Sequence, residues 1–380
     1  MEQLRQDDPP WTGPYATLAR VDSEREQERT PDRRYLARSA DGLRTVMVCL
    51  PRSGADPTRW VVEAEGARRQ SLPGFLPVTE VGGSATSPWY ATPYLPRLTL
   101  PDALAAYGRP LPETAVRALG ARLATALAAA HARGVTHAGL SPAAVLLGAE
   151  GPRLACFGAV RAAAPDGVDR RGAPGLDPGC LAPEQAQGGR PRPLGDIYAL
   201  GAVLAYGSTG HTVPERAELP ASLRPLIAAC LSRDPAERPS AEQMAAELAA
   251  GSTVMGGGGE PSSGAAQSPP TGRADGPAWP VPAVPDGRVR PVPATPAAIS
   301  DAPIRPVPTV LDGSPAPVPT VLDSSPAPVP TVLDGAGPAL NPDEPSPFPL
   351  PAPLVAALAR QSARMLALPL PRPRPHAEVS

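Results

Sequence analysis

The stretch HAGLSPAAVLL, residues 137–147, lies between two clear patterns and decides how the chain is interpreted. Before it, LPETAVRALGARLATALAAAHARG has Ala and Leu at helical spacing and stops at Gly134, a residue suited to end a helix. After it, VLLGAEGPRLA predicts a pair of strands. The stretch is therefore predicted to be a loop that begins at His137, contains Leu140 and Pro142, and connects a helix to a hairpin.

The composition of the chain disfavours several classes of protein. The 380 residues carry a formal net charge of -2, and all 35 basic residues are arginine. No basic face stands out, so nothing favours nucleic acid as a partner. The polar, acidic N-terminus is unlike a secretory signal, and no run of about 18 apolar residues could form a transmembrane helix, so a cytoplasmic location is predicted. The cysteines lack the paired spacing of a disulfide framework or a zinc site: Cys49, Cys156, Cys180 and Cys230.

Periodicity divides the predicted folded domain, residues 13–251, into two unlike parts. Short strand-like runs and one helical segment, RWVVEAEGARRQ, occupy residues 13–100. Residues 101–251 are mostly helical in pattern, and SAEQMAAELAAG opens with Ser240 and Gln243 as a capping box. This layout predicts an α+β fold with a small β-rich N-terminal lobe and a larger helical C-terminal lobe.

The last third of the chain has a different composition. About 30 of the 57 prolines follow Gly251. With little apolar surface to bury, residues 252–353 are predicted to be a disordered linker rich in Pro, Gly and Ala. LVAALARQSARMLAL, residues 354–368, predicts a short amphipathic helix, and 369–380 a disordered tail. The favoured expectation is that the helix packs on the folded domain or forms only transiently, and docking to a partner or a membrane surface is the alternative.

Five motifs arrive in a fixed order: a helix ending in AAAHARGVTH, the loop with Leu140 and Pro142, the strand pair, CFG, and LAPEQ. Together they resemble the C-lobe of bacterial serine/threonine protein kinases of the eukaryotic type, in which H-R-D-L-K-P-x-N, D-F-G and A-P-E follow one another. The resemblance covers about residues 13–250 and implies a two-lobed protein-kinase-like fold followed by the disordered Pro-rich tail. An unrelated α+β protein with ordinary helix and turn residues is the alternative.

The resemblance identifies where the family's catalytic groups would lie. In the family these are the loop Asp that receives the proton of the substrate hydroxyl, the loop Lys, the loop Asn, the Asp of D-F-G and the ATP-binding Lys of the N-lobe. The matching positions are, in the same order, Gly139, Ser141, Ala144, Cys156 and Cys49. A thiolate is a poor ligand for Mg²⁺, which prefers oxygen. No lysine from elsewhere can substitute, because the chain contains none.

The loop DSEREQERTPDRR, residues 22–34, stands where the family has its glycine-rich phosphate-binding loop. It has no glycine, so side chains would keep backbone N–H groups away from phosphates. Its five acidic residues would repel a triphosphate, although four arginines partly offset them. The resemblance therefore implies a protein with no catalytic, cofactor-binding or metal-binding residues, in which ATP and Mg²⁺ are not expected.

Several positions with a structural role in the family are retained. His137 keeps its place in the loop, and Phe157 and Gly158 keep the last two residues of D-F-G. Asp196, in GDIYALG, matches the helix aspartate that holds the catalytic-loop backbone in the family. The other histidines are expected to be structural or incidental: His131, His211 and His376.

The activation segment of the family corresponds to Arg161–Glu184, which contains no Ser, Thr or Tyr and so offers no phosphorylation switch. Glu184 and Arg238 match the ion pair that links this segment to the C-lobe. Glu63 matches the helix glutamate that pairs with the missing lysine, and is expected to have no partner. Asp177 falls where a threonine is usual; it could imitate a fixed negative charge, but a plain surface aspartate is favoured.

The tail contains three copies of PVPTVLD at an 11-residue spacing. Each copy presents a threonine followed three residues later by Asp, at Thr309, Thr320 and Thr331. Phosphothreonine with such a side chain resembles the ligand type of forkhead-associated domains, common partners of bacterial serine/threonine kinases. Three copies would add avidity. A repeat that arose by slipped DNA replication in a linker explains the pattern equally well.

The sequence thus predicts a catalytically inactive kinase-like protein that acts as a signalling scaffold or regulator. In this prediction an active kinase phosphorylates the tail threonines, and a phosphothreonine reader then binds them. The alternative is a weak or unconventional ATP-dependent serine/threonine kinase, or a protein that still binds ATP. A third possibility is that the folded domain is a vestige and only the tail is functional.

Overall fold

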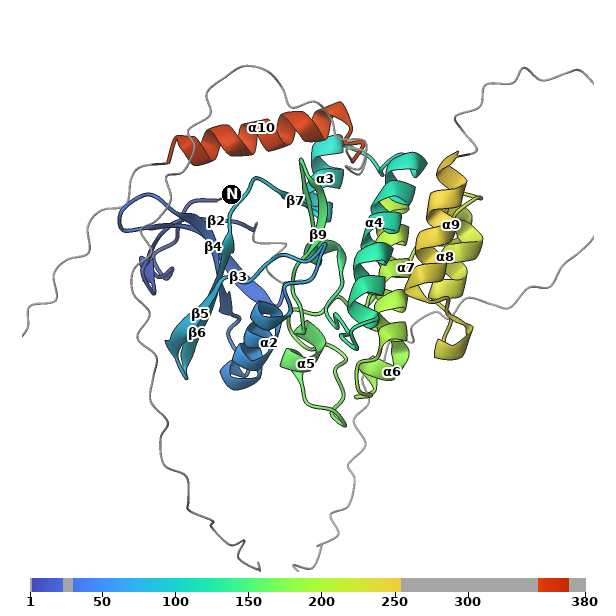
Figure 1. Ribbon diagram of the computed structural model, residues 1–380, viewed down its shortest axis with the longest axis horizontal. Helices are drawn as coiled ribbons and strands as arrows, with labels where there is room; N and C mark the ends of the chain where they lie inside the picture. The colour runs from blue at the N-terminus through green and yellow to red at the C-terminus, as the bar shows by residue number, and fades with distance from the viewer. Residues whose placement is uncertain (1, 23–29, 254–347, 369–380) are drawn as a thin grey trace, which may run out of the picture. The chain divides into compact units, whose positions relative to one another are not determined.

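The computed structural model is shown in Figure 1, and it describes residues 2–22, 30–253 and 348–368. The tail at 369–380 and nearly all of the predicted linker lie outside these residues. The three candidate phosphoacceptors also lie outside them: Thr309, Thr320 and Thr331.

The N-terminal lobe is built on a six-stranded antiparallel sheet in the order β1-β2-β3-β4-β6-β5. The register places Cys49 of the central strand opposite Arg34 on one side and Tyr90 on the other. This register brings three residues of the candidate site to the middle of the sheet. The strands are β1 (Trp11–Thr12), β2 (Tyr15–Arg20), β3 (Asp32–Ser39), β4 (Thr45–Pro51), β5 (Glu80–Ser84) and β6 (Ser87–Pro93).

The sheet extends upstream of residue 13, where the sequence patterns placed the start of the folded domain. Strand β1 pairs with β2. Asp8 is only 7 % exposed and binds the Arg20 side chain at 2.6 Å. Its carboxylate also accepts a hydrogen bond of 2.7 Å from the Tyr35 hydroxyl. Residues before position 13 therefore contribute to the packing of this lobe.

One helix, α2 (Pro57–Gln70), packs against β5 and β6. It begins after Asp56, whose carboxylate accepts hydrogen bonds from two backbone N–H groups of the first turn. Pro57 suits the first helical position because a backbone N–H at that position has no partner within the helix, so its absence in proline costs no hydrogen bond. The helix buries Trp60 and Ala64 toward the sheet. The predicted helical segment is thus confirmed.

The C-terminal lobe is helical, and the predicted two-lobed α+β fold is confirmed. Helix α4 packs against α7 and α9. Gly120 permits this contact, since a Cβ there would lie 2.8 Å from side-chain atoms of Leu204 and Leu248. The predicted capping box is present: Ser240 N–H donates to Gln243 Oε1 at 2.7 Å, and Gln243 N–H donates to Ser240 Oγ at 3.2 Å. The helices are α3 (Leu100–Tyr107), α4 (Glu113–His131), α5 (Ala159–Ala163), α6 (Pro183–Ala186), α7 (Pro193–Thr209), α8 (Arg224–Cys230) and α9 (Ala241–Thr253), with 3-10 turns at Pro142–Ala144, Arg216–Glu218 and Pro235–Glu237.

A second, three-stranded sheet includes the strand that follows the loop at residues 137–144. It contains β7 (Leu98–Thr99), β8 (Val145–Gly148) and β9 (Gly151–Leu154) in that order. The pairing of β8 with β9 confirms the predicted hairpin. The loop at 137–144 therefore leads directly into a buried strand, which fixes its position.

The predicted C-terminal helix is present as α10 (Ala352–Leu366) and packs on α3, the favoured expectation from its sequence (Figure 1). None of the helices in the described part of the chain is long and apolar enough to cross a membrane.

Candidate functional site

Asp196, in the first turn of α7, holds the loop that begins at His137. Its carboxylate accepts hydrogen bonds from the backbone N–H groups of His137 and Ala138, both at 2.8 Å. It also lies 2.9 Å from Nε2 of His131. Ala138 has a left-handed φ of 51°, a conformation that costs free energy and that these hydrogen bonds hold in place. The expected role of Asp196 is confirmed, and His131 acts as a structural partner to it.

The CFG residues are attached to the same loop. Gly158 N–H donates to the carbonyl of His137 at 2.8 Å. The rings of Phe75, His137 and Phe157 form a cluster with centroid separations of 5.3, 6.0 and 6.4 Å. Burial lowers the pKa of His137 to about 4, so its ring is neutral near pH 7. The three retained residues therefore form one structural unit.

Glu63 was expected to have no partner, and this expectation was wrong. Arg161 of α5 donates to its carboxylate from Nε at 2.9 Å, and Nη2 lies 2.8 Å away. The guanidinium also lies 5.0 Å from the centre of the Phe157 ring. Gly158 has a left-handed φ of 75°, a conformation that favours glycine, and a Cβ there would lie 2.1 Å from Glu63 Oε2. Glu63 is thus paired with an arginine of the segment that follows CFG.

The segment between CFG and LAPEQ is anchored to the C-lobe. Arg238, whose side chain is fully buried, donates to both oxygens of Glu184 at 2.7 and 2.9 Å. This confirms the expected ion pair. Asp177 was expected to be a plain surface residue, but it is 9 % exposed and accepts a hydrogen bond from Gly179 N–H at 2.9 Å. Asp177 therefore caps a tight turn.

The backbone around Gly139 leaves no room for a side chain. A Cβ at this position would lie 2.0 Å from the carbonyl oxygen of Cys156 and 3.0 Å from Cβ of Ala159. The position that the resemblance matches to the proton-accepting Asp therefore accepts only glycine in this conformation. Ser141, matched to the loop Lys, is only 7 % exposed.

Three other positions matched to catalytic groups lie in one buried apolar cluster, which we call the cleft cluster. Burial raises the pKa of Cys49 well above its usual range and that of Cys156 to about 12, so both are neutral thiols near pH 7. Ala144 is fully buried and has no polar side-chain atom. The cleft cluster contains Met47, Cys49, Trp60, Ala64, Leu76, Ala144, Leu146, Ala155, Cys156 and Ala159.

A buried ion pair lies beside the cleft cluster, in the segment matched to the phosphate-binding loop. Arg34 on β3 binds Asp22 through both carboxylate oxygens, with 2.7 Å between Nε and Oδ2. Each side chain is 1 % exposed. Arg34 also donates to the carbonyl of Ala143 at 3.3 Å, which connects the N-lobe to the loop of the C-lobe. Burial alone would lower the pKa of Arg34, but the Asp22 carboxylate raises it well above the ordinary value.

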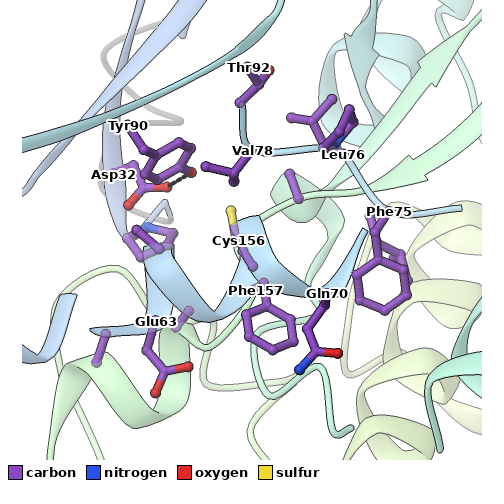
Figure 2. Close-up of a pocket in the computed structure, with 18 of the residues that line it drawn as sticks. Asp32, Glu63, Gln70, Phe75, Leu76, Val78, Tyr90, Thr92, Cys156 and Phe157 are labelled. Atoms are coloured by element: carbon purple, nitrogen blue, oxygen red, sulfur yellow. Dashed lines mark hydrogen bonds between the residues drawn. The ribbon is translucent and has the colours of Figure 1, made fainter. Parts of the chain in front are cut away.

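Asp32 joins helix α2 to the sheet. Its carboxylate accepts hydrogen bonds from Trp60 Nε1 at 2.6 Å and from the Tyr90 hydroxyl at 2.8 Å, and the two rings stack at 5.2 Å. Burial raises the pKa of Asp32. Figure 2 shows Tyr90 directed at Asp32, in a pocket that Cys156 also lines. This pocket holds a cavity of only about 40 Å³. The contact ties helix to sheet, as the family's lysine–glutamate pair would.

The segment that follows CFG packs against the cleft cluster and the N-lobe. Leu176 packs against the cleft cluster. Gly175, with a left-handed φ of 79°, approaches the N-lobe so closely that a Cβ would lie 2.6 Å from Cα of Pro31. Arg170 is fully buried and donates to the carbonyls of Ala164 and Gly189. The segment is therefore folded against both lobes.

Three arginines of the site were not predicted from the sequence: Arg34, Arg161 and Arg170. Arg34 carried a usable signal, because strand periodicity places it on the same face of β3 as Asp32 and the buried Leu36. Arg161 and Arg170 lie in a segment without strong periodicity, where an exposed arginine is the usual case. Among the described residues, no group of three or more His, Cys, Asp or Glu side chains is arranged to hold a metal ion.

Comparison with known proteins identifies relatives of this chain. No family model matches it. The probable serine/threonine-protein kinase PkwA of Thermomonospora curvata is 32 % identical over 269 residues, which are 65 % of this chain and 35 % of that protein. The serine/threonine-protein kinase AfsK of Streptomyces coelicolor is 32 % identical over 271 residues, covering 66 % and 33 %. AfsK of Streptomyces griseus is 33 % identical over 264 residues, covering 64 % and 32 %.

The chain thus spans about one third of the length of these curated relatives. Among solved structures, the Mycobacterium tuberculosis PknI kinase domain is 22 % identical with a TM-score of 0.49, covering 62 % of this chain and 95 % of that domain.

The relatives match about two thirds of this chain. Within the domain, Asp196 supports the loop at His137, and Glu184 binds Arg238, as the resemblance implies. The chain belongs to the bacterial serine/threonine protein kinase family.

Proposed function

We propose that this protein is a catalytically inactive member of the kinase family that works by binding other proteins, as a cytoplasmic signalling scaffold or regulator. The observation that carries the proposal is the burial of Cys49, Ala144 and Cys156 in one apolar cluster. In the family, phosphoryl transfer uses a lysine, an asparagine amide and a carboxylate at the matching positions, the last two to hold Mg²⁺, and such groups contribute orders of magnitude to the rate. All four cysteines are free and buried, which suits a reducing compartment.

The residues of the cleft do not fit Mg²⁺ and ATP. Magnesium takes oxygen ligands, and Ala144 and the neutral thiol of Cys156 supply none. The Arg34 guanidinium could attract phosphate, but its charge is already neutralised by Asp22, which binds its Nε–Nη2 edge, and its Nη1 donates to the carbonyl of Ala143. A nucleotide phosphate would have to displace Asp22 from this buried pair, and breaking a buried pair costs about 3–5 kcal/mol. We therefore expect neither ligand to bind.

The retained contacts support a role in protein binding. The Glu184–Arg238 pair and the hydrogen bonds to Asp196 maintain the backbone of the two segments that surround the cleft. Neither contact supplies a group for phosphoryl transfer. Keeping the contacts that define the surface while losing the catalytic groups is what a binding module requires.

We also propose that the tail threonines are phosphoacceptors for an active bacterial serine/threonine kinase and are then bound by a forkhead-associated domain. The support is the threefold repeat of threonine with Asp three residues later. The candidate sites are Thr309, Thr320 and Thr331.

A phosphotransfer assay on the full-length protein tests both parts. With radiolabelled ATP and Mg²⁺ or Mn²⁺, the protein alone should transfer no phosphate to itself or to a general protein substrate. Adding an active bacterial kinase should place phosphate on the three tail threonines, as located by mass spectrometry. A triple Thr→Val variant at 309, 320 and 331 is the matched control and should lose both the phosphate and the binding of a forkhead-associated domain.

The assay also has clear contrary outcomes. Transfer by the protein alone would contradict the loss of catalysis if it disappears in a Cys156→Trp variant, since a contaminating kinase would be unaffected by that change. Unmodified threonines after incubation with several active kinases would contradict the tail proposal only. If a chain lacking residues 1–251 behaved like the full protein in cells, the folded domain would be a vestige.

The second candidate function is a weak or unconventional protein kinase, or a protein that still binds ATP. It is favoured by the names of the relatives, which are all serine/threonine-protein kinases. The same phosphotransfer assay distinguishes it from the first.

A further inference from the structure

Helix α10 rests against the lobe junction through a small set of side chains. Leu354, Ala357 and Leu358 are buried, at 1, 8 and 8 % exposure, and they lie at i, i+3 and i+4 on one face. Phe348, just before the helix, is 6 % exposed and lies under the Arg122 guanidinium at 5.9 Å. The opposite face of the helix is exposed, including Val355 at 52 %. The helix is thus an amphipathic element bound in a groove.

The groove lies beside residues 93–99, the lobe connector that joins the N-terminal sheet to α3. Helix α10 packs on α3, and its residues Ala357 and Gln361 line a cavity of about 240 Å³. The other walls of this cavity include the lobe connector and two members of the cleft cluster, Met47 and Leu146. Figure 1 shows α10 running from beside the N-lobe sheet to α3. The helix therefore covers one side of the former nucleotide cleft.

The contact is incompletely packed. The helix buries one narrow face, through Leu354, Ala357 and Leu358. The cavity of about 240 Å³ beside Ala357 and Gln361 lacks the packing contacts that a filled interface would make. A small contact with unfilled space beside it favours an exchangeable helix.

We propose that the groove formed by α3 and the lobe connector is a docking site for an amphipathic partner helix. In this proposal α10 competes with the partner helix for the same groove. The helix that fits is defined by α10 itself: leucines at i and i+4, and a small residue at i+3. When α10 leaves, the partner helix takes its place and covers the same cavity. This proposal rests on the proposed function, because it identifies the surface through which an inactive kinase-like domain would bind a protein.

A peptide exchange experiment tests the proposal on the full-length chain. The probe is a fluorescent peptide with the sequence of residues 350–368. The variant Leu354→Asp/Leu358→Asp releases the cis helix by placing charges in the groove. The control variant Val355→Asp/Leu366→Asp adds the same charges on the exposed face, where Leu366 is 77 % exposed.

The released variant should bind the peptide at least tenfold more tightly than the wild type and the control variant, because its groove is empty. A peptide carrying the same two Leu→Asp changes should not bind. Hydrogen exchange of the backbone at residues 93–99 should be at least tenfold faster in the released variant and return to the wild-type rate with saturating peptide. Equal peptide affinity for all three proteins, or no binding to any, would overturn the proposal.

Unfolding of the released variant would also abolish peptide binding, so its folding is measured separately. The melting temperature and circular dichroism report whether the released variant stays folded, and Ala357→Trp provides a second way to displace the helix by overfilling the groove. The phosphotransfer assay does not depend on α10. A failed peptide exchange together with absent phosphotransfer would therefore overturn the docking site and leave the proposed loss of catalysis intact.

Discussion

Arg34 and Asp22 form a bidentate ion pair with both side chains 1 % exposed, and Arg34 extends it across the lobes to the carbonyl of Ala143. The pair lies next to the thiols of Cys49 and Cys156. It therefore places an internal cation and its own counter-ion in the cleft. Leu176 also packs against the cleft cluster, and α10 lies beside the lobe connector, residues 93–99.

Breaking this pair from one side should destabilise the fold strongly. Arg34→Met leaves the Asp22 carboxylate buried and unpaired, and should lower the free energy of unfolding by about 3–5 kcal/mol. The double variant Asp22→Leu/Arg34→Met should recover most of that loss, since apolar residues can replace a buried pair. Urea unfolding measures both. Arg33→Met, at the half-buried neighbouring position, is the control and should cost less than about 1 kcal/mol. A double variant no more stable than Arg34→Met would contradict the account of this pair.

A side chain at Gly139 should not be tolerated. Because a Cβ at Gly139 would lie 2.0 Å from the Cys156 carbonyl oxygen, Gly139→Ala should cost about 3 kcal/mol or more through overpacking. The control is Gly207→Ala on α7, where the nearest atom would be 3.6 Å away. It should be neutral or stabilising by up to about 1 kcal/mol from helix propensity. Thermal unfolding compares the two, and equal effects would show that the loop backbone is more adaptable than the structure indicates.

Acid should destabilise the protein through His137. Its pKa is about 4 in the folded state against 6.5 for the exposed side chain, so the unfolded state binds a proton first as the pH falls. The stabilisation is complete above pH 6.5 and is lost progressively toward pH 4, by about 3 kcal/mol for this residue. His137→Phe, which suits the neighbouring Phe75 and Phe157 rings, should flatten that part of the stability profile. His211→Phe, at an exposed position, should leave it unchanged. A profile unaltered by His137→Phe would contradict the assignment.

The N-terminal residues should contribute a second, more acidic transition. Burial opposes ionisation of Asp8, but hydrogen bonds from Arg20, Tyr35 and a backbone N–H hold its pKa at about 2. The stabilisation from this carboxylate is present above about pH 4 and is lost as the pH falls through about 2. Asp8→Asn should therefore lower stability at neutral pH by about 1–3 kcal/mol and reduce the loss below pH 4. Asp7→Asn, whose side chain is 79 % exposed, should change neither.

The sequence predicted the fold because the strongest signals were local. The α4 helix, the β8–β9 hairpin and the capping box at Ser240 depend on short-range periodicity and on capping residues, which a single sequence displays directly. The Glu184–Arg238 pair could also be predicted, because the motifs around both residues fix their roles in the family. The two-residue strand β1 lies upstream of the predicted boundary because so short an element has no periodicity to detect.

The candidate site was predicted by position but not by environment. Sequence spacing matched Cys49, Gly139 and Cys156 to catalytic positions of the family, yet it could not show that the backbone excludes a side chain at Gly139. It also could not pair Arg34 with Asp22 or Arg161 with Glu63. Such pairs depend on which residues tertiary folding brings together, and a charged residue in a polar segment is more often exposed.

We propose that the cleft binds no Mg²⁺–ATP, and a titration of the full-length protein with ATP and Mg²⁺ measures this binding. If the dissociation constant were about 50 µM, about 5 mM ATP would add about 2.7 kcal/mol of stability and raise the melting temperature by about 5–10 °C. We predict a shift of less than about 1 °C and no heat of binding by calorimetry. A saturable shift of several degrees that requires both ATP and Mg²⁺ would contradict the account.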